Sequence, residues 1–144
     1  SPILFHLLNN RGHIEDMTFM LQREVVERIV AKNGSKIYGR LSVMMQAFFN
    51  VEMIFIVPPE CFKPEPKIDS AIVYFKPITN PLVKDIDVFE KIVKLSFSQR
   101  RKTLKNCLKS SLTQNQTSID LSQRAEALSV NDFIQLTNDY EKRY

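Results

Sequence analysis

The spacing of apolar residues along the first 80 positions alternates between helical and strand-like patterns. Ser1 and Pro2 precede apolar residues at helical spacing, which predicts a short amphipathic helix that ends near residues 9–12. Residues 16–22 are almost all apolar after the first, and we expect a central strand buried on both faces. Two helices and two strands are then expected over residues 25–30, 41–49, 51–57 and 71–75. This order predicts an α/β fold whose last two strands are antiparallel.

From Asn80 and Pro81 onward the apolar pattern is helical only. Apolar stripes run through residues 89–97 and 104–112, and the charged segment between them predicts that one helix ends and another begins. Thr103 is the expected N-cap of the second of these helices. Two more small helices are expected near the C-terminus, the second capped by Ser129. We therefore expect two domains, which comprise residues 1–79 and 80–144.

A proline-rich connector, VPPECFKPEPKIDSA at residues 57–71, joins the last two predicted strands. It holds four of the seven prolines, which exclude both a helix and a central strand and predict a stiff arm. In this arm Phe62 lies between Cys61 and Lys63, with Lys67 close behind. An aromatic ring among cations suits stacking on a nucleic-acid base beside its phosphate. The alternative interpretation is a ring that fills the core beneath a surface loop.

Positive charge is concentrated in one segment of the chain. The formal net charge is only +4, but residues 91–119 contain no acidic residue. The basic residues in this segment are Lys91, Lys94, Arg100, Arg101, Lys102, Lys105 and Lys109. A segment of one sign is typical of a surface that binds a polyanion, and the alternative is a solvated helix face. The three basic residues before Thr103 are expected at a helix N-terminus, where backbone N–H groups also attract phosphate.

Two further polar positions lie beside the predicted elements. Arg40 enters an apolar helix next to a glycine, where it can hold a phosphate or form an ion pair with Glu24 or Glu27. Asp69 and Ser70 end the arm, and we expect them to hold it to its strand through local backbone hydrogen bonds.

The sequence offers little for metal, disulfide or membrane chemistry. Cys61 and Cys107 are far apart, and His6 and His13 show no ligand spacing, so we expect free thiols and no metal site. No apolar run approaches the ~20 residues that span a bilayer, and no signal-peptide pattern is present. We therefore expect a soluble cytoplasmic protein that does not contact membranes.

Three motifs together resemble a known family: the arm PPECFKPEPKIDSA, the segment LQREVVERI with YGRLSV after it, and the basic run FSQRRKTLKN. In this order and spacing they are similar to the ribosomal RNA adenine dimethyltransferases, which dimethylate two adjacent adenosines near the 3′ end of small-subunit rRNA. The resemblance covers nearly the whole chain. It implies the C-terminal part of a Rossmann-like methyltransferase domain, followed by a small all-helical RNA-binding domain.

The motifs that bind S-adenosylmethionine in this family are absent from the chain. The glycines are Gly12, Gly34 and Gly39, so no GxG occurs, and the asparagine-leucine-proline-tyrosine catalytic motif is also missing. The chain therefore resembles the C-terminal part of such an enzyme. We expect S-adenosylmethionine as the cofactor of the parent enzyme, no cofactor-binding residue in this chain, and no activity of the chain alone.

The resemblance also implies roles for individual residues. Phe62 would stack on the flipped target adenine. The residues that would hold rRNA phosphates are Arg100, Arg101 and Lys102, with Arg40, Lys63 and Lys67 as weaker candidates. The implied partner is small-subunit rRNA in the immature 30S subunit, where the enzyme would act as a monomer in ribosome biogenesis.

Two other functions remain open. The antibiotic-resistance branch, which methylates large-subunit rRNA, resembles the arm equally well, although the run QRRKTLKN and the helical tail favour the small-subunit enzymes. The other is a non-catalytic RNA-binding or ribosome-assembly module that keeps the fold without the chemistry.

Overall fold

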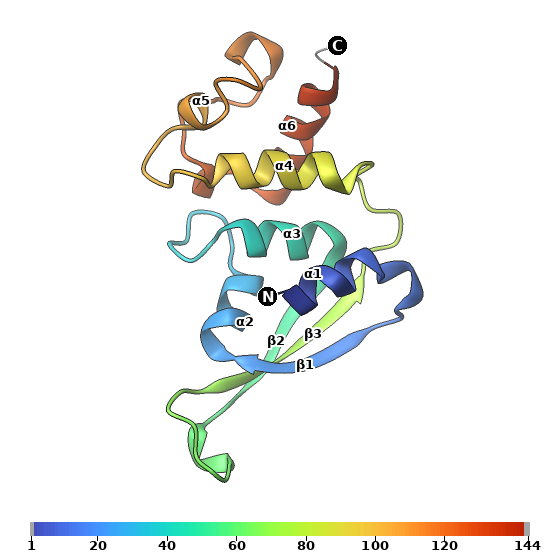
Figure 1. Ribbon diagram of the computed structural model, residues 1–144, viewed down its shortest axis with the longest axis vertical. Coiled ribbons are helices and arrows are strands. Elements are labelled where there is room, and N and C mark those ends of the chain that lie inside the picture. The colour runs from blue at the N-terminus through green and yellow to red at the C-terminus, as the bar shows by residue number, and fades with distance from the viewer. Residues whose placement is uncertain (1, 143–144) are drawn as a thin grey trace.

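The computed structural model describes residues 2–142, which form a three-stranded sheet and six α-helices (Figure 1). The first part contains α1 (Pro2–Asn9), β1 (Met17–Gln22), α2 (Arg23–Val30), α3 (Arg40–Phe48), β2 (Phe49–Val57) and β3 (Ser70–Pro77). The second part contains α4 (Ile86–Ser96), α5 (Leu104–Cys107) and α6 (Val130–Lys142). Short 3₁₀ helices lie at Arg11–His13, Pro59–Cys61, Gln114–Gln116 and Ala125–Ala127. The α/β class expected from the sequence is confirmed.

The sheet has the order β1-β3-β2, and both strand pairs are antiparallel. The predicted antiparallel pairing of the last two strands is therefore confirmed. The prediction of a central strand at residues 16–22 is wrong, because β1 lies at the edge and pairs with β3 alone within residues 2–142. Met17 is buried, whereas Thr18 and Met20 are exposed. The strand looks uniformly apolar in sequence because Met20 is an apolar residue on the exposed face.

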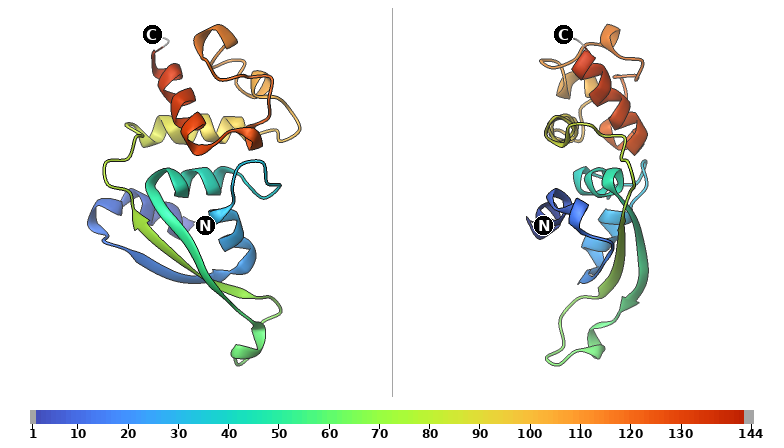
Figure 2. Two further views of the ribbon diagram at one scale, coloured as in Figure 1. Left: turned by 180° about the vertical axis from the view of Figure 1, so that it is seen from behind. Right: turned by 90° about the vertical axis from the view of Figure 1, so that its right-hand side faces the viewer.

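A β-bulge in β2 changes which of its side chains face each side of the sheet. The register shifts between Met53 and Phe55, so Ile54 is the extra residue. Beyond the bulge, Phe55 pairs with Ile72, which also pairs with Met20 on β1. These three side chains form an apolar row across the sheet, on the face that no helix of the described residues covers (Figure 2).

The opposite face of the sheet carries the core and is covered by α1, α2 and α3 (Figure 2). Val26 and Ile29 of α2 are fully buried there, as their helical spacing predicted. The Phe75 ring on β3 is met edge-on by Phe19 at 6.2 Å and Phe49 at 5.7 Å. One layer of helices therefore fixes the orientation of the strands that lead into the arm.

The helices of the second part pack directly on those of the first. Helix α4 contacts both α3 and α6, and it crosses between them in Figure 1. The rings of Phe48 on α3 and Phe89 on α4 meet edge-on at 6.0 Å. Phe97, at the end of α4, packs between Tyr38 at 6.1 Å and Phe133 at 5.5 Å. A single apolar core thus runs through both parts of the chain.

The helix break predicted for the second part agrees with the structure, although α5 ends at Cys107 and does not extend along the whole stripe predicted at 104–112. Helix α4 ends at Ser96 and α5 begins at Leu104, so the predicted break is confirmed. Ser129 caps α6, since its Oγ accepts from the Asp132 N–H at 3.1 Å. Thr103 stands at the N-cap position of α5, but its side chain makes no cap hydrogen bond.

Candidate functional site

The arm, residues 58–69, projects from the end of β2 and β3 that lies farthest from α4, α5 and α6 (Figure 1). Its turn is built from local backbone contacts. The N–H of Cys61 donates to the Pro58 carbonyl at 3.2 Å, and that of Phe62 donates to the Pro59 carbonyl at 3.1 Å. Within the part of the chain that the structure describes, side chains at 58–68 form no hydrogen bond or ion pair. Backbone contacts and prolines therefore set the shape of residues 58–68.

Phe62 lies in the arm and outside the core. Its side chain is half buried, and it is not among the apolar residues that pack against the core cluster. The neighbouring Cys61 is an exposed free thiol, and Lys63 and Lys67 are exposed as well. A partly exposed ring with exposed lysines close after it in sequence can stack on a planar base while the cations contact its phosphate.

The base of the arm is held to α2 by Arg23. Its Nη1 donates to Asp69 Oδ2 at 3.0 Å, and its Nε donates to Glu27 Oε1 at 2.6 Å. These hydrogen bonds, first that to Glu27 and then that to Asp69, raise the pKa of Arg23. The expected local role of Asp69 is thus wrong, because its partner lies 46 residues earlier. A cleft of about 390 Å³ opens here, lined by Arg23, Glu24, Glu27, Pro59, Lys67, Ile68 and Asp69.

The first residue of the basic run, Arg100, contacts the loop between α2 and α3. Its Nη2 donates to the carbonyl oxygens of Lys36 at 3.0 Å and Tyr38 at 2.8 Å. Glu126 Oε2 lies 3.9 Å from the same nitrogen. Arg100 therefore joins the connector between α4 and α5, residues 97–103, to a loop more than 60 residues earlier.

Arg101 and Lys102 are exposed, and neither side chain has a hydrogen bond or ion pair among the described residues. Their backbone is nevertheless fixed. The Lys102 N–H donates to the Gln99 carbonyl at 3.0 Å, and that of Leu104 donates to the Gln123 carbonyl at 2.9 Å. Helix α5 is a single turn of four residues, so the charge that these two side chains present does not depend on a helix dipole.

Arg40 lies at the junction of α1, α3 and α4. Its Nη2 donates to Glu90 on α4, and its guanidinium lies 5.0 Å from the centroid of the Phe5 ring on α1. The alternative that pairs Arg40 with Glu24 or Glu27 is wrong, because Glu24 pairs with Arg28 and Glu27 pairs with Arg23. No local pattern in the sequence points to Glu90 as the partner, because it lies 50 residues later.

Tyr38 is a buried residue that sequence reasoning missed. It is 1% exposed, and its hydroxyl has no hydrogen-bond partner among the described residues. Burial, and to a lesser extent the charge of Asp132, raises the pKa of this phenol above its usual range. Its ring packs on Phe97 while its carbonyl accepts from Arg100, so Tyr38 connects the first part of the chain to the second.

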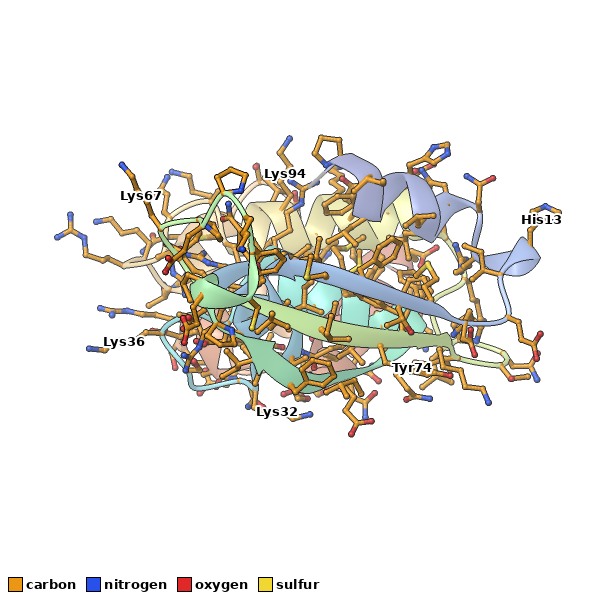
Figure 3. The ribbon with its side chains drawn as sticks, turned by 90° about the horizontal axis from the view of Figure 1, so that it is seen from below. His13, Lys32, Lys36, Lys67, Tyr74 and Lys94 are labelled. Atoms are coloured by element: carbon orange, nitrogen blue, oxygen red, sulfur yellow. The ribbon has the colours of Figure 1, made fainter. Side chains whose placement is uncertain are left out.

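The candidate residues do not meet in one pocket. The arm, the loop between α2 and α3, and the connector between α4 and α5 lie along one side of the molecule (Figures 1 and 2). Seen from below, Lys36 of that loop and Lys67 of the arm extend from the same end of the molecule, and His13 extends from the other (Figure 3). The loop and the connector form a cationic edge, and the arm extends it with an aromatic ring and two exposed lysines, although the arm also carries the exposed Glu60 and Glu65. We refer to these three segments as the cationic edge, which suits a long polyanion.

None of the helices described in residues 2–142 combines the length and the apolar composition needed to cross a membrane.

Comparison with known proteins identifies relatives along the whole chain. A family model described as ribosomal RNA adenine dimethylase matches residues 1–142. A ribosomal RNA small subunit methyltransferase A from Nitrosospira multiformis is 47% identical over 147 residues, which cover 99% of this chain and 57% of the relative. The protein of the same name from Francisella tularensis subsp. novicida is 51% identical over 144 residues, covering 96% and 55%. The chain thus spans a little over half the length of these relatives.

Two solved structures share the fold. A dimethyladenosine transferase from Plasmodium falciparum superposes with a TM-score of 0.85 at 26% identity, over 99% of this chain and 62% of that one. The 23S rRNA methyltransferase ErmE superposes with a TM-score of 0.69 at 22% identity, over 97% and 60%. The second likeness is one of fold alone. With the family model matched across both parts, the chain belongs to the ribosomal RNA adenine dimethylase family.

Proposed function

We propose that this chain is the RNA-engaging portion of an S-adenosylmethionine-dependent rRNA adenine-N6 dimethyltransferase. Its substrate is two adjacent adenosines near the 3′ end of small-subunit rRNA. The enzyme acts in the cytoplasm, as a monomer, on the immature 30S subunit during ribosome maturation. The shared name of the curated relatives, small subunit methyltransferase A, supports this choice of substrate.

The observation that carries the proposal is the position of Phe62 on the arm. The exocyclic amine of adenine is a poor nucleophile, because its lone pair is delocalised into the ring. An enzyme that methylates it must take the base out of the stack and align the amine for in-line attack. A ring outside the core, on a stiff connector, is a suitable surface for the extruded base. Such base stacking is worth ~1–3 kcal/mol.

The phosphate contacts are assigned to the exposed cations on the same side of the molecule. Arg101 and Lys102 have no competing partner within residues 2–142, and Lys63 and Lys67 follow the aromatic ring in the arm. Arg100 and Arg40 contribute less directly, since each guanidinium is already engaged within the protein. Their intramolecular contacts position the elements that carry the other cations.

S-adenosylmethionine supplies the methyl group when it is bound, but the residues of this chain do not fit a site for it. A nucleotide cradle needs glycines at which the backbone approaches the ligand closely. A Cβ at Gly12 or Gly34 would meet nothing within 4 Å, and at Gly39 it would lie 3.7 Å from Arg100 Nη1. We assign cofactor binding to other residues of the full-length protein and expect this chain alone to be inactive.

The two parts of the chain take different roles in this proposal. Residues 1–79 form the end of the methyltransferase domain and carry the arm. Residues 80–144 form the helical RNA-binding domain. This division is supported by the segment between β3, which ends at Pro77, and α4, which begins at Ile86.

Large-subunit rRNA is the alternative substrate. The fold likeness to the 23S enzyme ErmE keeps this alternative open, but its TM-score of 0.69 is lower than the 0.85 for the dimethyladenosine transferase. A non-catalytic module of the same fold is the other alternative.

The test is methyl transfer by the full-length protein, measured alongside RNA binding. We expect transfer to small-subunit rRNA and not to large-subunit rRNA. Phe62→Ala is expected to slow transfer by roughly 5- to 150-fold, as the loss of ~1–3 kcal/mol of stacking implies. RNA affinity should remain near that of the unaltered protein, and Phe62→Tyr should keep most of the activity.

Each alternative predicts a different result. Transfer to large-subunit rRNA alone would assign the protein to the resistance branch. Tight RNA binding without methyl transfer to any rRNA would indicate a non-catalytic module. An equal loss of binding and transfer in Phe62→Ala would mean that this ring supports the fold rather than the target base.

A further inference from the structure

We propose that Lys36, in the loop between α2 and α3, is a further RNA-phosphate contact and that Arg100 helps to fix its position. The inference rests on the proposed function, because it assumes that RNA lies along the cationic edge. Neither the charge pattern nor the motifs of the sequence single out Lys36, which lies far from the acid-free segment 91–119. The contacts of its loop place Lys36 beside the basic run.

The loop that carries Lys36 is held by its own hydrogen bonds. The Ser35 N–H donates to the Lys32 carbonyl at 3.2 Å, and the Tyr38 N–H donates to the Ser35 carbonyl at 3.3 Å. The Ile37 N–H donates to Ser35 Oγ at 3.2 Å. The chain turns at Gly34, whose φ of 91° favours glycine. Such a loop presents Lys36 from a fixed backbone.

The second part of the chain clamps this loop from the other side. The Gly34 N–H donates to the Glu126 carbonyl at 2.6 Å, and Asn33 Nδ2 donates to the Ala127 carbonyl at 3.1 Å. Arg100 Nη2 donates to the carbonyl of Lys36 itself at 3.0 Å. The backbone of Lys36 is therefore in direct contact with the basic run, one residue before Arg101.

The charge of Lys36 is available to a ligand. Its side chain is exposed and has no hydrogen bond or ion pair within residues 2–142. Glu126, whose backbone holds the loop, has its carboxylate 3.9 Å from Arg100, so these two opposite charges largely offset each other. Lys36, Arg101 and Lys102 have no ion pair within residues 2–142, so their charges, like those of the nearby Lys32 and Arg124, are not offset.

The loop also lies between the other two cationic segments. In Figure 1 it is found on the same side as the arm and the connector between α4 and α5, at a height between them. Figure 3 shows Lys36 extending from the same end as Lys67. A nucleic-acid strand that runs from Arg101 to the arm would pass Lys36, so this residue closes a gap in the cationic edge.

The test compares the salt dependence of RNA binding for matched lysine variants of the full-length protein. The probe is an RNA that covers the 3′ end of small-subunit rRNA. Lys36→Ala should weaken binding roughly 5- to 10-fold near ~0.1 M salt and lower the salt slope by ~0.7–0.9, as expected for one lost phosphate contact. Lys36→Arg should retain the slope. The control is Lys76→Ala, which removes an exposed lysine at the end of β3 opposite the arm and should change neither quantity.

The possible failures can be told apart. If Lys36→Ala keeps the parental slope while a double Arg101→Ala, Lys102→Ala variant lowers it by ~1.5, the proposed function stands and the role of Lys36 is refuted. If neither variant changes the slope, the RNA-binding edge itself is refuted. If Lys76→Ala lowers the salt slope as much as Lys36→Ala does, Lys36 acts only through the net charge of the protein. That result would also refute a direct phosphate contact. Thermal unfolding of each variant verifies that the fold is intact.

Discussion

The two connectors that carry the candidate residues share one sequence feature and have different structural environments. Each contains a phenylalanine near lysine or arginine: Phe62 in the arm, and Phe97 in the connector between α4 and α5. The Phe97 ring packs between two aromatic rings, and Arg100 donates to two distant carbonyl oxygens. Side chains at 58–68 have no such hydrogen bonds in the described part of the chain.

This difference separates two ways of fixing a charged segment in place. Beyond its base, where Asp69 accepts from Arg23, the arm is shaped locally, by prolines and by backbone hydrogen bonds across three residues. The other connector is shaped by partners more than 60 residues away in sequence. Substitutions in the arm should therefore change function without changing stability, and several substitutions in the second connector should change both.

The largest effect on stability is expected for the pair of phenylalanines. Phe97→Ala removes a ring that contacts Tyr38 and Phe133, and should lower the free energy of unfolding by about 2–4 kcal/mol. Phe62→Ala should lower it by less than about 1 kcal/mol, because this ring is outside the core. Urea unfolding of the full-length variants measures both. Equal losses would remove the distinction between the two connectors.

The next largest effect on stability is expected for the neighbouring residues Arg100 and Arg101. Arg100→Ala should cost about 2 kcal/mol of stability, because it leaves two carbonyl oxygens without their charged donor. Arg101→Ala should stay within about 0.5 kcal/mol of the unaltered protein, since its side chain is exposed and has no such partner among the residues that the structure describes. The midpoint of thermal unfolding should therefore be lower for Arg100→Ala than for Arg101→Ala. An Arg100→Ala variant that unfolds at the same temperature as the unaltered protein would contradict a structural role for the long-range contacts of Arg100.

A smaller effect is expected at the loop that the clamp holds. Gly34→Ala should cost about 1 kcal/mol, because a side chain is strained at a φ of 91° even though the space around it is open. Gly12→Ala provides the control, since its position is equally open and its φ is not positive. Comparable unfolding midpoints for the two variants would argue against a conformationally constrained loop.

The smallest effect on stability is expected from removing both lysines of the arm. Lys63→Ala with Lys67→Ala should change the free energy of unfolding by no more than about 0.5 kcal/mol. The salt slope of RNA binding should nevertheless fall by ~1.5, which corresponds to two lost phosphate contacts. A loss of stability without a change in slope would place these lysines in the structural framework instead.

Most of the fold could be predicted from periodicity, and the errors have a physical cause. The helices at 2–9 and 86–96 and the paired strands β2 and β3 follow from their apolar spacing, and Ser129 was identified as a cap from its position. Strand β1 was placed at the centre because Met20 is apolar yet exposed. Periodicity reports which residues are apolar, and it does not report whether a second layer covers them.

The candidate site was predictable only where it depends on local chemistry. The exposed lysines and the proline-shaped turn of the arm could be inferred from adjacent residues. The partners of Arg40, Asp69 and Arg100 could not, because each lies at least 46 residues away and is brought close by the tertiary fold. A basic run in sequence therefore contains residues with different roles, and only the three-dimensional contacts separate Arg100 from Arg101.

The bulge at Ile54 gives β2 one position at which its length can change without reversing its faces. Side chains in a strand alternate with a period of two, so an insertion or deletion of one residue in a regular stretch reverses the face of every residue beyond it. Deleting Ile54 would instead leave a regular ladder in which Met53 still pairs with Val73 and Phe55 with Ile72, so the residues that lead into the arm would keep their faces. A one-residue change of length should therefore be tolerated at the bulge and not elsewhere in β2, which makes the bulge the point where this strand can evolve in length.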